Sequence, residues 1–312
     1  MITVSKIYVG VDISKDNLDI CIEPLGKSFR IANSQEAIEK FIKKLPEHDG
    51  IKIGCESTGG YEKLFDQILN KHCIELWIIE PKRIKGFIVS KNCKSKTDKI
   101  DAQKIAQFVM QNNEDYKQIK RTECEQKLRA LVDRKQDLIM MLASEKTRFK
   151  HPSHALSIKS IKKIMDFFET EIESIDVQIK ESIELNEDLK KKSELLISIP
   201  GIGKATAAVL LSSLPELGII GNNQIASLIG VAPYTRESGN YKGKSFISGG
   251  RAIPRKALYM CALTTIKYHL PLKDFYDRLK AKNKPFKVVM VAIMRKLIII
   301  ANVILRKGEM CK

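Results

Sequence analysis

Residues 6–23, KIYVGVDISKDNLDICIE, contain two runs of mostly β-branched and other apolar residues. The first run covers residues 6–14 and the second covers residues 17–23. The polar residues from Ser14 to Asp16 lie between the runs and favour a tight turn. This pattern predicts two β-strands connected by that turn.

The same kind of alternation continues through the first third of the chain. Apolar residues recur with helical spacing in residues 34–45, SQEAIEKFIKKL, and again in residues 60–71, GYEKLFDQILNK. Further short apolar runs predict strands at residues 28–34, 51–58 and 74–81. Strands that alternate with helices indicate an α/β sheet with a partly parallel core.

The rest of the chain is expected to be mostly helical, and we divide the whole into regions 1–118, 119–192 and 193–312. The middle region is long, highly charged and free of glycine, with Pro152 between two helical stretches. It predicts an antiparallel coiled-coil hairpin with a narrow apolar seam. Such an arm serves dimerisation or nucleic-acid binding, unless it is an ordinary helical linker. The last region contains a glycine-rich loop.

The composition favours a polyanionic partner. The 312 residues carry a formal net charge of +17, with an isoelectric point of about 9.4. An excess of this size is typical of proteins that bind nucleic acid. The seven cysteines form no CxxC pair, so neither a zinc site nor a disulfide framework is expected.

No membrane segment is expected. The N-terminus lacks the pattern of a signal peptide. Residues 288–305, VVMVAIMRKLIIIANVIL, are apolar for almost the length of a bilayer, but Arg295 and Lys296 stand at the middle. Charges there are costly in lipid, so we predict a buried core helix and a cytoplasmic protein.

Four acidic residues of the first region are candidate metal ligands. Asp12 and Glu56 end predicted strands, while Asp98 and Asp101 lie one turn apart at the start of a predicted helix. Clustered carboxylates repel one another unless a cation lies among them, and Mg²⁺ prefers oxygen ligands. Each acid alone is equally compatible with a turn or a helix start. The first strand also fits an actin-like or sugar-kinase fold, but no kinase-type phosphate loop follows it.

Residues 195–214, LLISIPGIGKATAAVLLSSL, predict two helices joined by a tight turn. Gly201 and Gly203 permit close approach of a phosphate to the backbone, and Lys204 opens the second helix. The motif resembles the helix-hairpin-helix of DNA-binding proteins, which positions a duplex without reading its sequence. The alternative is a glycine turn between core helices.

Residues 237–256, ESGNYKGKSFISGGRAIPRK, place serines in a flexible basic loop. Spacing alone leaves Ser238, Ser245 and Ser248 nearly equal as candidate nucleophiles. The loop and its borders also supply the cations that we expect to hold phosphates, namely Arg236, Lys242, Lys244, Arg251, Arg255 and Lys256.

Six motifs in order resemble those of the DEDD-type insertion-sequence transposases, the IS one-ten family, which are related to the Piv invertases and described as bridge-RNA-guided recombinases. Three belong to the first region, GVDISKD, CESTGGY and KTDKIDAQKIA. Three belong to the last, IPGIGKATAAVLL, LIGVAPYTRESGNYKGKSFISGGRAIPRKALYMCAL and FYDRLKAKNKPFKVVMVAIMRKLI. The resemblance covers nearly the whole chain, and Pro254 is its one local departure.

The resemblance implies an RNase H-like, RuvC-like first domain with Mg²⁺ on Asp12, Glu56, Asp98 and Asp101. It also implies a helical arm used in assembly and a mostly α C-terminal transposase domain with Ser238 as nucleophile. The expected activity is excision and insertion of a mobile DNA element through a serine–DNA ester, by a homo-oligomer with a guide RNA at the bacterial nucleoid. The alternative is a RuvC-like nuclease that cuts branched DNA with water.

Overall fold

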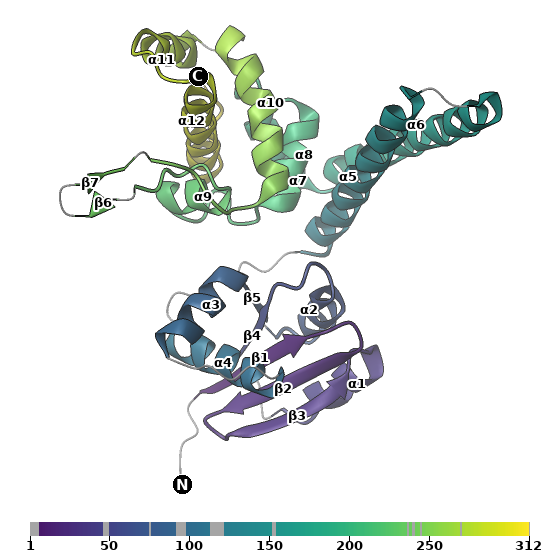
Figure 1. Cartoon of the computed structure of the whole chain (residues 1–312), viewed down its shortest axis with the longest axis vertical. Coiled ribbons are helices and arrows are strands. Elements are labelled where there is room, and N and C mark those ends of the chain that lie inside the picture. Colours follow the sequence, from purple (N-terminus) through teal and green to yellow (C-terminus); the bar gives the residue numbers. More distant parts are fainter. Residues whose placement is uncertain are drawn as a thin grey trace. The chain divides into compact units, whose positions relative to one another are not determined.

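The computed structural model divides the chain into two compact units, Met1–Lys120 and Arg121–Lys312. Figure 1 shows a sheet with helices in the first unit and an almost wholly helical second unit. The structure describes residues 6–45, 50–74, 76–91, 98–112, 122–151, 154–235, 237–238, 241–243, 245–268 and 270–311.

The first unit is built on a five-stranded sheet with the order β3-β2-β1-β4-β5. β1 pairs antiparallel with β2 and parallel with β4; β2 and β3 are antiparallel, and β4 and β5 are parallel. The partly parallel core and all five strands predicted from the sequence are therefore confirmed. Their bounds are β1 Ile7–Ile13, β2 Asn17–Glu23, β3 Lys27–Ala32, β4 Ile51–Glu56 and β5 Leu76–Ile79.

Helices cover both faces of this sheet. On one face, α1 (Gln35–Ile42) and α2 (Glu62–Lys71) pack with the inward-facing residues of β1 and β4. On the other, α3 (Pro81–Ser90) and α4 (Asp98–Gln111) pack around Trp77 of β5. Helix α3 was not predicted from the sequence, although Pro81 at its first turn is a common helix start.

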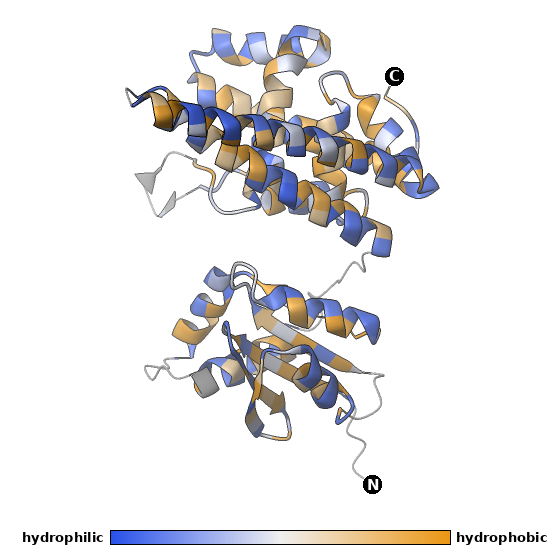
Figure 2. Cartoon of the chain, turned by 90° about the vertical axis from the view of Figure 1, so that its right-hand side faces the viewer, coloured by the Kyte–Doolittle hydropathy of each residue, from blue (hydrophilic) through white to orange (hydrophobic). Residues whose placement is uncertain are grey.

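The predicted helical hairpin consists of α5 (Glu123–Phe149) and α6 (Ala155–Glu184). Thr122 begins α5 with a capping box, in which its hydroxyl accepts from Glu125 N at 3.2 Å. An ion pair of 2.8 Å between Lys146 and Glu169 links the two helices. Figure 2 shows hydrophobic and hydrophilic residues alternating along the long helices, as expected for helices that bury one side only.

The hairpin belongs to the same compact unit as the C-terminal helices. Leu128 and Val132 of α5 join one continuous core with residues of the helices that follow. This unit also contains the short hairpin of β6 (Glu237–Ser238) and β7 (Tyr241–Lys242). The remaining helices are α7 (Glu187–Ile197), α8 (Lys204–Ser213), α9 (Asn222–Leu228), α10 (Ala252–Tyr268), α11 (Leu270–Ala281) and α12 (Phe286–Lys307).

The apolar helix α12 is the central core helix of the second unit. It is long and apolar enough to cross a membrane, yet half of its most apolar window is buried inside the protein. Its buried Asn302 accepts from Gly218 N at 2.7 Å and donates to Ile220 O at 3.0 Å. Lys296 is exposed, and Arg295 donates to the Asn223 side chain at 3.2 Å. The packing agrees with the predicted core helix.

Pro254 is compatible with a regular start of α10. It is the third residue of the helix and is buried. Backbone nitrogens in the first turn have no intrahelical acceptor, so a proline there removes no hydrogen bond.

Candidate functional site

Asp12 and Glu56 lie next to each other at the C-terminal ends of the neighbouring strands β1 and β4, and both point to the same face of the sheet. In the parallel pairing of β1 with β4, Gly10 lies opposite Gly54 and Val11 lies opposite Cys55. A Cβ on Gly10 would lie 2.1 Å from the backbone nitrogen of Ala106, and so points at α4. Because side chains alternate along a strand, Asp12 points to the same face as Gly10.

The same argument holds for β4. A Cβ on Gly54 would lie 2.4 Å from a methyl carbon of Val109 in α4, so Glu56 also points to the α4 face. The two glycines let α4 lie directly on the sheet. The two acids follow them by two residues, and both are half-buried.

The other two predicted acids belong to the first turn of α4. Asp98 is its first residue, and its side chain lies outside the described residues, while Asp101 is half-buried. Ala102, the next residue, contacts β1 at Gly10. Among the side chains that the structure describes, no group of three His, Cys, Asp or Glu residues is close enough to hold a metal ion. The described residues therefore supply two strand-end carboxylates, Asp12 and Glu56, whose oxygens are of the kind that Mg²⁺ prefers, but not a complete set of ligands.

Several carboxylates lie near Cys55 at the end of β4. Burial raises the pKa of the Cys55 thiol well above its ordinary value, and the carboxylates of Glu62, Asp66, Asp12 and Glu56 raise it further. Two of these acids belong to α2 and two to the strand ends. Cys55 packs in the core on the α2 side of the sheet, whereas Asp12 and Glu56 point to the α4 side, so these four acids do not form one cation site.

Glu62 is a buried carboxylate that the sequence analysis did not single out. It accepts hydrogen bonds from Gly60 N at 2.9 Å and from the Thr58 backbone and hydroxyl. Burial raises the pKa of Glu62, but these hydrogen bonds outweigh burial, so its pKa lies below the ordinary value. Glu62 therefore holds the turn that follows Glu56 of β4. The signal in the sequence was an acid two residues after the second glycine of that turn.

The two glycines between α7 and α8 have different surroundings. Gly201 has a φ of +99°, and a Cβ there would lie 2.1 Å from the hydroxyl of Thr265 in α10. Thr265 in turn donates to Pro200 O at 3.1 Å. Among the described residues, no atom outside its two chain neighbours lies within 4 Å of a Cβ on Gly203. Gly203 is exposed and caps α8 just before the exposed Lys204.

Ser238 is exposed on the β6–β7 hairpin, which Figure 1 shows extending away from the helices of its unit. Ser238 pairs with Tyr241 across the hairpin. Further down, Tyr234 and Phe246 form a bridge with hydrogen bonds of 2.8 and 3.0 Å. The serine is therefore presented at the end of a tethered protrusion.

The base of this protrusion is fixed by close packing and by an ion pair. Gly250 has a φ of +76°, and a Cβ there would lie 2.2 Å from Gly230 N. Arg251 donates to both carboxylate oxygens of Glu216, at 2.6 and 2.7 Å, and to Ser213 O at 2.7 Å. Arg255 donates to Gly249 O. Arg251 and Arg255 were expected to bind phosphates, but in the structure both guanidinium groups bind other groups of the protein. The role of Glu216 as the partner of Arg251 was not predicted from the sequence.

The remaining predicted residues are distributed along the same segment. Ser245, Ser248 and Lys256 are exposed. The Lys242 backbone lies in β7, but its side chain, like Arg236 and Lys244, lies outside the described residues.

A mixed α/β unit with carboxylates at its sheet edge, within a chain of net charge +17, is typical of the class of proteins that process nucleic acid. Two family models match: one described as "Transposase" over residues 9–152, the other as "Transposase IS116/IS110/IS902 family" over residues 193–277. The chain belongs to the IS110 family of transposases and recombinases, enzymes that act on DNA.

Relatives agree with this family. The chain is 30% identical over 320 residues to the pilin gene-inverting protein of Moraxella bovis, covering 98% of this chain and 97% of the relative. The protein of the same name from Moraxella lacunata matches equally well. An insertion element IS110 protein of Streptomyces coelicolor is 30% identical over 123 residues, 37% of this chain and 29% of the relative.

Proposed function

We propose that this transposase excises and inserts a mobile DNA element through a covalent serine–DNA intermediate formed by Ser238. The observation that carries the proposal is the exposed position of Ser238 on a protrusion whose base is fixed by Arg251 and Glu216. A protruding serine on a rigid base can reach a strand without rearrangement of the core. The gene-inverting relatives favour a reaction that rejoins strands over one that only cuts them.

The chemical step conserves the energy of the broken bond. The Ser238 oxygen attacks a phosphorus atom of DNA and gives its proton to a base. One phosphorus–oxygen bond to the neighbouring sugar breaks, and that sugar oxygen leaves as a hydroxyl. Attack of another sugar hydroxyl on the serine ester then reseals the strand, so exchange needs no external energy source.

The first unit is proposed to be an RNase H-like, RuvC-like domain that holds Mg²⁺ on Asp12, Glu56, Asp98 and Asp101. The strand order β3-β2-β1-β4-β5 and the neighbouring positions of Asp12 and Glu56 support this proposal. Transposases of the DEDD type generally depend on a divalent metal. Bound Mg²⁺ would neutralise charge that develops on the attacked phosphate.

The second unit is proposed to hold the DNA backbone. The turn between α7 and α8 would act as a helix-hairpin-helix, with the exposed Gly203 and Lys204 at a phosphate. Lys256 and the loop cations Arg236, Lys242 and Lys244 would contact further phosphates. We retain 1–118, 119–192 and 193–312 as functional regions, with the α5–α6 hairpin as a coiled-coil arm in a homo-oligomer.

A guide RNA is proposed on the family resemblance alone. A structured non-coding RNA would then choose the target, since a backbone clamp reads no bases. The test is the DNA that flanks the gene. It should encode a non-coding stretch with two loops, one complementary to the element's junction and one to its target.

The serine mechanism is tested by trapping the intermediate. The full-length protein is incubated with element-end DNA and Mg²⁺, denatured, and run on a denaturing gel. The wild type should yield a protein–DNA adduct that maps to Ser238 by mass spectrometry. Ser238→Ala should yield none while still binding DNA, and the exposed Ser245→Ala and Ser248→Ala are matched controls that should retain the adduct. Asp12→Asn should bind DNA but lose cleavage.

Each other outcome has a defined meaning. Mg²⁺-dependent nicking that continues in Ser238→Ala, with no adduct in the wild type, would identify a RuvC-like nuclease that uses water. An adduct at Ser248 would leave the recombinase in place and move the nucleophile. Cleavage that is unchanged in EDTA would refute the role of the four acids.

A further inference from the structure

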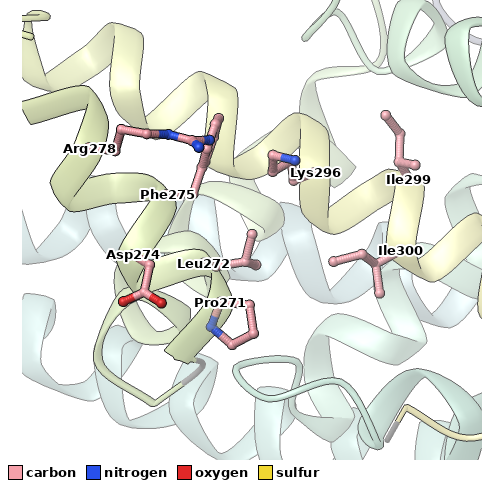
Figure 3. A pocket seen from close by; sticks show the side chains of 8 residues that line it. All are labelled: Pro271, Leu272, Asp274, Phe275, Arg278, Lys296, Ile299 and Ile300. Atoms are coloured by element: carbon pink, nitrogen blue, oxygen red, sulfur yellow. The ribbon is translucent and has the colours of Figure 1, made fainter.

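A cleft of about 510 Å³ lies between α11 and α12, outside every site described above. Its apolar lining includes Leu272 from α11 and Ile299 and Ile300 from α12, and Figure 3 shows these side chains together with the cations beside them. The volume falls within the range of small-ligand sites in proteins. An apolar cleft of this size fits a flat, mostly apolar group.

Two cations are held at this cleft by one aromatic ring. The guanidinium carbon of Arg278 lies 5.3 Å from the ring centroid of Phe275, and the Lys296 nitrogen lies 4.6 Å from it. Figure 3 shows the end of the Arg278 side chain beside the ring of Phe275, with Lys296 on the neighbouring helix α12. Within the described part of the chain, neither cation forms an ion pair with a carboxylate. The ring thus orders two positive charges and leaves them available to an anion.

Positive charge continues beyond the cleft. Asp274 also lines it, but the sequence contains no acidic residue between Asp277 and Glu309. That interval carries nine cations, and Lys280 in the last turn of α11 and Lys282 and Lys284 between α11 and α12 are exposed. Charge of one sign along an exposed turn complements a chain of phosphates.

We propose that this cleft binds single-stranded DNA, with one unpaired base in the apolar cleft and the adjoining phosphates at Arg278 and Lys296. Sequence-tolerant single-strand sites combine aromatic side chains that contact bases with a basic groove for the backbone, and Phe275 is the aromatic residue that lines this cleft. A duplex keeps its bases stacked inside and offers the cleft no such group. The proposal rests on DNA as the substrate of this family, and it is independent of Ser238.

The test compares strand types in the full-length protein. Fluorescence anisotropy measures binding of a labelled single strand and of the duplex with the same sequence. Ile299→Trp fills the cleft without changing charge, and Arg278→Ala removes one ordered cation. Ile299→Trp should weaken single-strand binding on the order of tenfold, since one bound base contributes about that much. Arg278→Ala should also weaken it and make it less dependent on salt, since one phosphate contact is lost. Duplex affinity should change little with Ile299→Trp.

Lys273→Ala is the matched control, because Lys273 is an exposed cation of α11 that does not line the cleft. It should leave single-strand binding nearly unchanged. Equal losses for single strand and duplex in Ile299→Trp would overturn the unpaired-base assignment. Tighter, cleft-dependent binding of RNA of the same sequence would overturn the assignment to DNA. Absence of the Ser238 adduct together with normal single-strand binding would contradict the serine mechanism but would still support single-strand binding at the cleft.

Discussion

Single glycines show how one residue type serves different purposes in this chain. Gly201 adopts a left-handed backbone and packs on Thr265, so its missing side chain serves the interior of the second unit. Gly203 has a φ of −94° and open space around it, so neither packing nor backbone geometry requires glycine there. Glycine is an acceptable N-cap residue for α8, and the open backbone would also let a phosphate approach, as the proposed helix-hairpin-helix requires.

This contrast yields a paired prediction. Gly203→Val should lower the melting temperature only slightly, because valine is a poorer N-cap than glycine. It should weaken duplex DNA binding equally for all sequences, because a backbone contact reads no bases. Gly201→Val should instead lower the free energy of unfolding by about 1–3 kcal/mol or more, from strain at positive φ and the clash with Thr265. Thermal melts and binding to two unrelated duplexes provide the measurements. Normal DNA binding by Gly203→Val would count against the backbone clamp.

Glu62 should make the free energy of unfolding depend on pH. Its folded-state pKa lies below its ordinary value, so the ionised form is the one that folding stabilises. This contribution is fully present above the unfolded pKa of about 4.3 and is lost as pH falls through the lower folded value. Glu62→Gln should therefore cost about 1–2 kcal/mol at neutral pH, from the charged hydrogen bonds it loses.

The measurement is urea unfolding of Glu62→Gln and wild type from pH 7 to about pH 3, across the range in which carboxylates titrate. The difference between them should shrink as the pH falls below the unfolded pKa. Glu36→Gln, whose carboxylate is exposed beside Lys40, is the control and should differ little from wild type at any pH. A difference for Glu62→Gln that does not change with pH would show that packing, and not charge, explains the loss.

At the level of elements, the β6–β7 hairpin depends on contacts outside itself. Its strands have two residues each, too few for stability on their own. The Tyr234–Phe246 bridge, the contact of Gly230 with Gly250 and the bidentate Arg251–Glu216 pair supply what the strands lack. The serine protrusion should therefore respond to substitutions remote from Ser238.

Glu216→Ala tests this dependence. It leaves Arg251 without its carboxylate, and the free energy of unfolding should fall by about 1–3 kcal/mol because the pair is bidentate and partly buried. The rate of adduct formation should fall more than DNA affinity does, since the protrusion is loosened but its cations remain. Glu169→Ala, at a well-exposed pair with Lys146, is the control and should cost less than about 1 kcal/mol. Unchanged adduct formation in Glu216→Ala would show that the ion pair does not position the serine.

For the whole molecule, the net charge of +17 predicts the response to salt. Each phosphate that the protein neutralises releases condensed counterions, so the logarithm of the affinity should fall linearly with the logarithm of the salt concentration. With six phosphate contacts, the affinity should drop roughly a thousandfold between about 50 and 200 mM salt. Anisotropy titrations at several salt concentrations measure the slope. A salt-independent affinity would contradict electrostatic binding.

The local pattern of apolar and polar residues was sufficient to predict the strands and most of the helices. The apolar runs at residues 6–14, 17–23 and 51–58 became β1, β2 and β4, because strand formation follows from β-branched residues and turn signals within a few positions. The core helix α12 was also predictable, since two central charges in an apolar run are costly in lipid and favour packing inside the protein. Helix α3 was missed because PKRIKGFIVS has one buried residue and too short an apolar pattern.

The arrangement of site residues required the tertiary structure. Asp12 and Glu56 are far apart in the chain, and only the parallel register of β1 with β4 makes them neighbours. The pairing of Arg251 with Glu216 and the packing of Gly201 on Thr265 likewise join residues from separate helices and loops. Secondary structure can be predicted from the sequence because it depends on interactions between residues a few positions apart. Charge pairing and close packing depend on contacts between distant segments, which exist only once the chain has folded.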